Sequence, residues 1–197
     1  MLTASFKKQA EWSEKPAYAL NDGFYFQNYS DAWTRGHMST FFKNSLITTL
    51  VALVFIVFFS VTVGFAVTKM KWKFRNVVAQ YFRFGIMIPV ATSLIPLFQI
   101  SRNAADQYRT CLILVYTASG ISFSIYLLQS YMKALPDEIL EASVIDGCGI
   151  YSMLLRIVLP LTKNAIITVL VIQFFFKWND LLYSMTFISS TKLKTIQ

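Results

Sequence analysis

The side chains that could do chemistry gather between residues 137 and 160 of this chain. Four of the ten acidic residues lie there, at positions 137, 138, 141 and 146, and two glycines and a proline follow them. His37 is the only histidine, and no nucleophile stands beside the carboxylates in a recognisable arrangement. The seven glycines form no phosphate-binding loop of the type Gly-x-x-x-x-Gly-Lys-Ser/Thr. The pattern therefore favours recognition of a partner over catalysis, and it predicts neither a metal site nor a bound nucleotide.

The residues around Gly147 predict two short helices joined by a sharp turn. Proline is favoured in the first turn of a helix and acidic side chains suit its N-terminus, so we expect the first helix to begin at Pro136. Gly147 lies where that helix should stop, because a left-handed backbone costs little at glycine. Gly149 permits a second bend, a second short helix follows, and Pro160 is expected to kink or restart the chain.

The first of these helices carries two small side chains, Ala142 and Ser143. Their size would let another protein surface approach the helix closely. The same residues also fit a solvated connecting loop with capped helix ends, and the residues by themselves leave both interpretations open.

The rest of the chain has the composition of a membrane protein. Hydrophobic residues make up 55% of it, charged residues only 14%, and the mean hydropathy is +0.50, values that soluble domains seldom combine. A helix of about 20 apolar residues crosses a bilayer, and residues 44–68 and 110–132 contain no charge. We therefore predict an all-α membrane protein, in which prolines and charges weaken the second and fourth spans. The spans are expected at about 45–67, 77–98, 111–131 and 158–178.

The distribution of basic residues orients these spans. Four lysines and arginines lie within residues 69–75, whereas the connection after the second span holds only two, together with Asp106. Because strongly basic loops stay in the cytoplasm, we expect residues 69–75 and 133–157 to be cytoplasmic and residues 1–43 to lie outside. The net charge of +8 fits this topology and contact with anionic lipid. The basic residues are dispersed, which argues against nucleic-acid binding.

Two further expectations follow from this topology. Cys111 would lie at the outer end of the third span and Cys148 on the cytoplasmic side, so the two thiols cannot pair. Residues 1–43 would be outside, although no signal sequence and no earlier helix carries them across. We therefore expect the sequence to be part of a longer protein.

The stretch from Glu141 to Pro160 follows a known spacing: Glu-Ala-Ala, three residues, Gly, nine residues, Ile, one residue and Leu-Pro. Every spaced position matches, although Ser143 replaces the second alanine. The matching residues are Glu141, Ala142, Gly147, Ile157, Leu159 and Pro160, with Asp146 before the glycine. This stretch resembles the EAA loop of inner-membrane permeases from binding-protein-dependent ABC importers. The segments NYSDAW, FFKNSL and KWNDLL are similar to the maltose-type second permease of the carbohydrate branch, so the resemblance covers nearly the whole chain.

The resemblance implies the transmembrane domain of a type I ABC importer, formed by residues 44–197 with residues 133–157 as its coupling loop. The first and last of the family's six helices would be absent. It also implies that the loop docks on a cytoplasmic ATPase, which binds ATP and Mg and does the chemistry. This chain would then be no enzyme and would hold no cofactor. The residues that would couple it to the ATPase are Glu141, Ala142, Ser143, Asp146, Gly147, Ile157, Leu159 and Pro160.

A second permease and an extracellular or periplasmic solute-binding protein would complete the importer in the bacterial inner membrane. The expected cargo is a sugar, first of all an oligosaccharide. Another polar solute such as glycerol phosphate is an alternative, as is a membrane docking protein without transport.

Polar residues within and beside the spans could line a path or a gate for the cargo. They could equally form bonds between helices or anchor the chain at the membrane interface, and the sequence leaves these readings open. Lys177 is an unusual neighbour for three of them, Trp178, Asn179 and Asp180. The candidates are Thr92, Ser93, Gln99, Ser119, Ser122, Trp178, Asn179 and Asp180.

Overall fold

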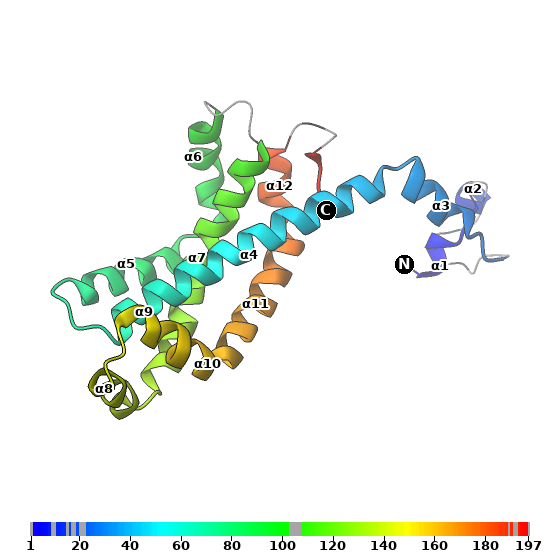
Figure 1. Cartoon of the computed structure of the whole chain (residues 1–197). Helices are drawn as coiled ribbons and strands as arrows, with labels where there is room; N and C mark the ends of the chain where they lie inside the picture. Colours follow the sequence, from blue (N-terminus) through cyan, green and yellow to red (C-terminus); the bar gives the residue numbers. More distant parts are fainter. Residues whose placement is uncertain are drawn as a thin grey trace.

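The computed structural model describes residues 2–8, 11–14, 16, 19, 23–102, 108–188, 190 and 193–196. Asp106, in the connection after the second predicted span, lies outside the described residues. Within them the chain forms helices and no strand, and Figure 1 shows two long helices, α4 and α7, surrounded by shorter ones. The helices are α1 Leu2–Ser5, α2 Glu11–Glu14, α3 Gln27–Thr34, α4 Met38–Thr68, α5 Arg75–Met87, α6 Val90–Arg102, α7 Tyr108–Lys133, α8 Asp137–Ile145, α9 Ile150–Met153, the π-helix η1 Leu154–Val158, α10 Leu159–Leu161, α11 Lys163–Trp178 and α12 Leu182–Phe187.

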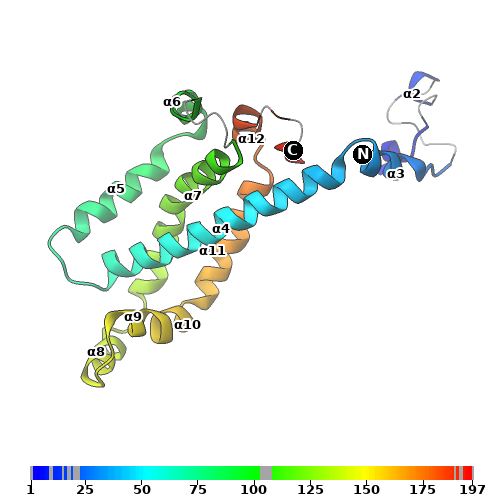
Figure 2. The same ribbon diagram turned by 45° about the horizontal axis from the view of Figure 1, so that its top comes forward.

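Helices α4 and α7 form the centre of the fold. Each is long and apolar enough to cross a membrane, which confirms the spans predicted at 45–67 and 111–131. The two helices pack against each other, from the hydrogen bond of Arg109 with Asn44 at one end to the packing of Phe65 near Met132 at the other. Helices α5 and α11 pack on this pair (Figures 1 and 2).

The other two predicted spans are bent. Helices α5 and α6 meet at 103°, so the span expected over 77–98 is not one straight helix. Its break lies at Ile88, which is extended (φ −81°, ψ 114°) because a proline disfavours the helical conformation of the residue before it. The helical segments before and after Thr162 meet at 74°, so the predicted kink or restart after Pro160 is confirmed. The described residues therefore hold two straight spans, or four if each bent pair crosses once.

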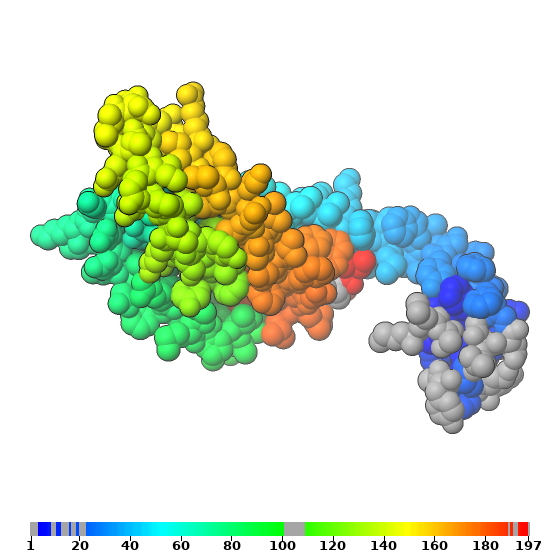
Figure 3. Space-filling model, turned by 90° about the horizontal axis from the view of Figure 1, so that it is seen from below, coloured from blue at the N-terminus to red at the C-terminus, as the bar shows by residue number. Residues whose placement is uncertain are grey.

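The N-terminal segment, which contains α1, α2 and α3, stands apart from the helical body and is joined to it by the start of α4 (Figure 3). It has a small core of its own, in which the rings of Phe6 and Phe24 pack edge to face with centroids 5.2 Å apart. The side-chain amide of Asn28 donates hydrogen bonds to the carbonyls of Ser5 and Lys7 at 3.0 and 2.8 Å. These contacts let the segment hold its shape away from the other helices.

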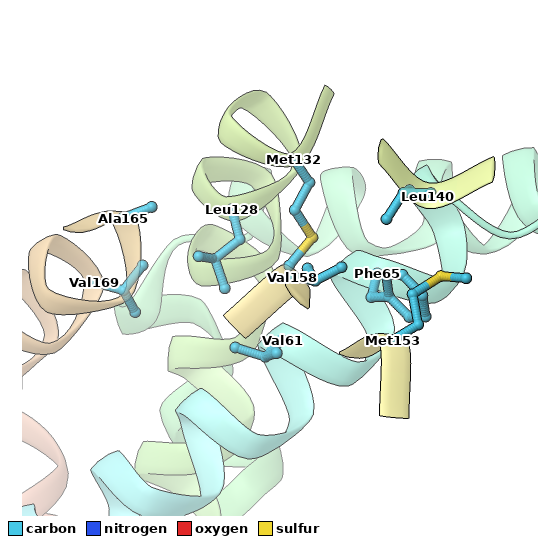
Figure 4. Close-up of a cluster of buried hydrophobic side chains, with 9 residues drawn as sticks. All are labelled: Val61, Phe65, Leu128, Met132, Leu140, Met153, Val158, Ala165 and Val169. Atoms are coloured by element: carbon cyan, nitrogen blue, oxygen red, sulfur yellow. The ribbon is translucent and has the colours of Figure 1, made fainter. Parts of the chain in front are cut away.

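Two buried apolar clusters hold the helical body together. The one that we call the loop-side cluster joins α4 and α7 to α8, α9, η1 and α11, and Figure 4 shows its side chains converging. The other lies among α4, α7 and α12. Lipid is as apolar as these side chains, so close packing is what favours such contacts within a membrane. The loop-side cluster consists of Val61, Phe65, Leu128, Met132, Leu140, Met153, Val158, Ala165 and Val169.

The closest approach of the central helices generates a first prediction. A Cβ atom on Gly120 of α7 would lie 2.5 Å from Cδ1 of Ile56 on α4 and 3.1 Å from Oε1 of Gln173 on α11. Gly120→Val should therefore force three helices apart and lower stability by about 1–3 kcal/mol, as overpacking usually does. Thermal unfolding of the purified protein in detergent measures the loss.

Gly64→Ala is the control for this substitution. It adds a single methyl group at the contact of α4 with α7, and the nearest neighbour of that group would be Sδ of Met132 at an ordinary 3.6 Å. The control should unfold at or above the temperature of the unmodified protein, because alanine favours a helix over glycine. Equal stability of Gly120→Val and Gly64→Ala would contradict the close packing described here.

Candidate functional site

The turn at the end of α8 is closed by backbone hydrogen bonds around Gly147. Gly147 has φ +77°, which confirms the left-handed conformation predicted for it. The amide of Cys148 donates to the carbonyl of Ser143 at 2.9 Å, and the amide of Gly147 donates to the carbonyl of Val144 at 3.0 Å. This pair of bonds is the Schellman arrangement, which satisfies carbonyls at a helix end. The helix itself begins at Asp137, and Pro136 precedes it as the N-cap residue rather than as its first residue.

The outer surface of the segment from α8 to η1 exposes both polar and apolar side chains. Glu141 and Ala142 are exposed, and no hydrogen bond or ion pair to the Glu141 carboxylate forms among the described residues. Ile145 is 85% exposed and Tyr151 is 82% exposed. Large apolar side chains that are almost fully exposed next to an unpaired carboxylate are typical of a protein-binding surface. Asp146 is exposed on the same surface.

Ser143 lies on the opposite face of α8. It is buried, and its hydroxyl donates to the carbonyl of Leu140 at 2.7 Å. Leu140 is the other buried residue of this helix and belongs to the loop-side cluster. The small size of Ser143 therefore serves packing within the chain, whereas Ala142 faces outward.

A groove of about 410 Å³ runs between α8, α9 and the segment after α4. Glu141 lines one side of it, and the cations Lys71 and Arg75 line the other. Glu141 and basic residues of the stretch 69–75 are thus neighbours in space. Both contribute charge to the same end of the molecule.

The segment after α9 continues as a π-helix because of the proline that follows. Pro160 has no amide hydrogen, and its ring would clash with the carbonyl four residues earlier in a regular α-helix. One wider turn precedes it, in which the amide of Leu159 donates to the carbonyl of Leu154. Ile157 and Leu159 are half-buried and pack against the loop-side cluster, whereas Pro160 is exposed. This turn leads from the exposed loop through α10 to α11.

A second group of polar side chains lies between α7 and α11. Lys177 is only 7% exposed, and its ammonium donates to the hydroxyl of Ser119 at 2.7 Å and lies 5.6 Å from the ring centre of Tyr116. The hydroxyl of Tyr116 donates to the Asp180 carboxylate at 3.0 Å. Gln173 lies one turn before Lys177 on α11, and its side-chain amide donates to the carbonyl of Gly120 and to the hydroxyl of Ser124, each at 3.0 Å. These residues bond neighbouring helices to each other.

The residues considered for a cargo path make several different local contacts among the described residues. Ser119 and Asp180 belong to the interhelical contacts just described, and Ser122 lies against Gly85 of α5. Thr92 bonds to its own helix turn, Ser93 lies 3.1 Å from the hydroxyl of Tyr183, and Gln99 is exposed. Trp178 stacks on Phe174 and packs edge-on against Phe42, and the exposed Asn179 caps the end of α11. The described residues place these side chains at several separate helix contacts.

Sequence reasoning missed Tyr116 and Gln173, and it set Lys177 aside. A signal for them exists, because Gln173 and Lys177 are four residues apart, as are Tyr116, Gly120 and Ser124. Residues at this spacing share one face of a helix. Polar or small side chains repeated at this interval on two apolar helices indicate that the two faces meet.

The turn at Gly147 generates a second prediction, for which Gly149 is a matched control. Neither glycine has an atom within 4 Å of the place where a Cβ would lie. Gly147 is left-handed, whereas Gly149 has φ −73° and ψ 162°, which any residue can adopt. Gly147→Ala should therefore cost about 1–2 kcal/mol in backbone strain.

Hydrogen exchange at the amides of residues 147 and 148 measures this cost. Exchange in Gly147→Ala should be about 5–30 times faster, the factor that corresponds to 1–2 kcal/mol. Exchange in Gly149→Ala should not change. Equal rates in the two variants would show that the left-handed turn does not hold the loop.

Comparisons with known proteins agree with this architecture. The family model "Binding-protein-dependent transport system inner membrane component" matches residues 56–196. The chain is 28% identical to the diacetylchitobiose uptake system permease protein NgcG of Streptomyces coelicolor, over 92% of this chain and 60% of that protein. It is 26% identical to the melibiose/raffinose/stachyose import permease protein MelC of Bacillus subtilis, over 100% of this chain and 71% of that protein. The chain thus spans between 60% and 71% of the length of these relatives.

The fold also matches that of a solved structure. The crystal structure of a bacterial ABC transporter involved in the import of the acidic polysaccharide alginate contains a chain that superposes with a TM-score of 0.85. The match covers 99% of this chain and 69% of that one, at 19% sequence identity, and it therefore shows the shared fold. The family model covers well over half of the chain and includes the loop from Glu141 to Pro160. The chain belongs to the family of inner-membrane components of binding-protein-dependent transport systems.

Proposed function

We propose that this chain is a permease subunit of an ATP-driven, binding-protein-dependent importer of saccharides. The observation that carries the proposal is the exposed loop at one end of the helical body. There the residues of the EAA pattern form a short helix that ends at a left-handed Gly147, with Glu141 and Ile145 on its outer surface.

The loop would act by docking α8 and α9 on a cytoplasmic ATPase subunit. Glu141 would pair with a basic side chain of that subunit, while Ala142 and the exposed Ile145 and Tyr151 would fill its apolar groove. ATP and Mg would be bound and used by the ATPase, and this chain would have no catalytic role. When the ATPase closes, movement of α8 would pass through the loop-side cluster to α4, α7 and α11. The spans would then alternate between two arrangements around a central path.

The proposed cargo is an oligosaccharide. Two relatives are named for the uptake of diacetylchitobiose and of melibiose, raffinose and stachyose, and the structural neighbour belongs to a transporter involved in alginate import. Thr92 and Gln99 are exposed side chains on α6 and could contact a polar cargo. Another polar solute such as glycerol phosphate remains the alternative.

The proposed assembly needs three kinds of partner. A second permease would complete the transmembrane path, ATPase subunits would bind the loop, and a solute-binding protein would deliver cargo on the outer side, where residues 1–43 would lie. The proposed location is the inner membrane of a bacterium, where lipid surrounds the spans. Genes for a solute-binding protein and for glycosidases beside this gene would support the saccharide assignment.

Substitutions in the loop test the proposed coupling. Gly147→Val should leave a permease that inserts in the membrane but transports poorly, because the turn is strained and the bulky side chain stands at the docking surface. Glu141→Ala should weaken ATPase binding less, since one polar contact is lost while the turn remains. The measurement is uptake of candidate saccharides in cells, normalised to inserted permease, together with co-purification of the ATPase.

Gly149→Val is the matched control, because it adds the same side chain two residues away at an allowed φ of −73°. Its uptake should stay close to that of the unmodified permease. A solvated connecting loop without a partner predicts normal uptake and normal co-purification in all three variants, and that result would sink the coupling role.

The proposed topology is tested with the native thiols. Cys111 and Cys148 are both half-buried and free. In a Cys111→Ser variant, a membrane-impermeant thiol reagent applied to intact spheroplasts should leave Cys148 unmodified, and opening the membrane should allow labelling. Labelling of Cys148 from outside would overturn the cytoplasmic placement of the loop.

A further inference from the structure

A single lysine side chain joins three parts of the fold near the loop. Lys69 directly follows α4, and its ammonium donates to the carbonyl of Leu135 and to Oδ1 of Asp137, each at 2.6 Å. Leu135 lies in the turn after α7, where its own amide donates to the carbonyl of Met132 at 3.3 Å. Asp137 is the first residue of α8. One cation therefore ties the end of a membrane-spanning helix to the start of the loop helix.

The two partners of this ion pair differ in their surroundings. The Lys69 side chain is only 6% exposed, whereas the Asp137 side chain is 74% exposed. The hydrogen bond from Lys69 and its charge lower the pKa of the Asp137 carboxyl below its ordinary value. An ion pair between two exposed side chains contributes little. Here the Lys69 side chain is buried, and its ammonium also donates to the carbonyl of Leu135. Removal of the ammonium would therefore cost two hydrogen bonds and not only the ion pair.

Helix α8 has few other attachments. Its buried residues are Leu140 and Ser143, and only Leu140 reaches the loop-side cluster. Apolar contacts are not directional, so a helix held by them alone can slide or rotate against its neighbours. Two short hydrogen bonds from one cation resist such movement, because their strength depends steeply on distance and angle. The first turn of α8 is thus fixed to the end of α4.

The other cations after α4 do not share this geometry. Lys71 and Lys73 are exposed, and the ammonium of Lys73 lies 5.6 Å from the ring centre of the neighbouring Phe74. Arg75 is half-buried at the start of α5 and lines the groove beside Glu141. All four residues can contribute to a positive loop, but Lys69 is the one whose ammonium bonds to the start of α8.

We propose that Lys69 is a positioning residue that transmits the movement of α8 to α4. The proposal rests on the proposed function, in which α8 docks on an ATPase. It adds that docking and transmission are separate properties of the chain: the outer surface of α8 binds the ATPase, and Lys69 converts the displacement of α8 into displacement of a spanning helix. Because α4 packs along α7, the central pair would move with it.

The experiment uses the complete importer in proteoliposomes, with its ATPase, second permease and solute-binding protein. Lys69→Met removes both hydrogen bonds and keeps the apolar stem, Lys69→Arg keeps the cation, and Lys73→Met removes an exposed cation four residues away. Three quantities are measured: co-purification of the ATPase, ATP hydrolysis stimulated by the loaded binding protein, and solute transported per ATP hydrolysed.

Lys69→Met should bind the ATPase as the unmodified permease does, while solute transported per ATP falls about tenfold, a usual size for the coupling between two sites. Lys69→Arg should restore most of this ratio, and Lys73→Met should not change it. A normal ratio in Lys69→Met would overturn the proposal. So would a loss of ATPase binding in proportion to the loss of transport, because Lys69 would then only shape the docking surface.

Asp137→Asn provides a second test that does not depend on the folding of Lys69→Met. It removes the ion pair but leaves the bond from Lys69 to the carbonyl of Leu135, so the ratio of solute to ATP should fall to an intermediate value. An unchanged ratio in Asp137→Asn would also count against the proposal. Failure of the proposed function is recognised separately, since the unmodified permease would then not bind an ATPase at all.

Discussion

The contact of α4 with α7 is the interaction on which the rest of the structure depends. Both helices are apolar over nearly their whole length, so they satisfy their backbone groups internally and can lie in lipid. They approach closely where Gly120 leaves room for Ile56 and Gln173. Helices α5 and α11 pack on this pair, and the loop-side cluster extends it to α8 and α9. A change at Gly120 is therefore felt by more than two helices.

The polar residues between α7 and α11 show how this helical body accommodates charge. Lys177 is almost fully buried, but its ammonium bonds to Ser119 and faces the ring of Tyr116, whose hydroxyl bonds to Asp180. Charged and polar side chains at such depth are costly unless they are paired. Their pairing here fixes α11 against α7. Ser119 and Asp180, two of the residues considered for a cargo path, belong to these contacts.

The loop at the end of the molecule combines a rigid turn with a light attachment. The hydrogen bonds around Gly147 fix the shape of α8 and the chain that follows it, whereas Leu140 and Lys69 hold the helix to the spans at two points. A short helix that keeps its shape but has few attachments can be displaced as a unit. Such a unit is well suited to receive force at its exposed surface and to deliver it at a defined point.

The sequence by itself determined the helical class, the two straight spans and the turn at Gly147. These features depend on composition and on local backbone preferences, so neighbouring residues suffice to predict them. It also indicated the family, through the spacing from Glu141 to Pro160. It could not show that Ser143 faces inward or that Lys69 reaches Asp137. These depend on which faces of distant segments meet, since Lys69 and Asp137 are 68 residues apart in the chain. Only the tertiary structure decided them, because a contact of that kind exists only once α4 and α7 have packed.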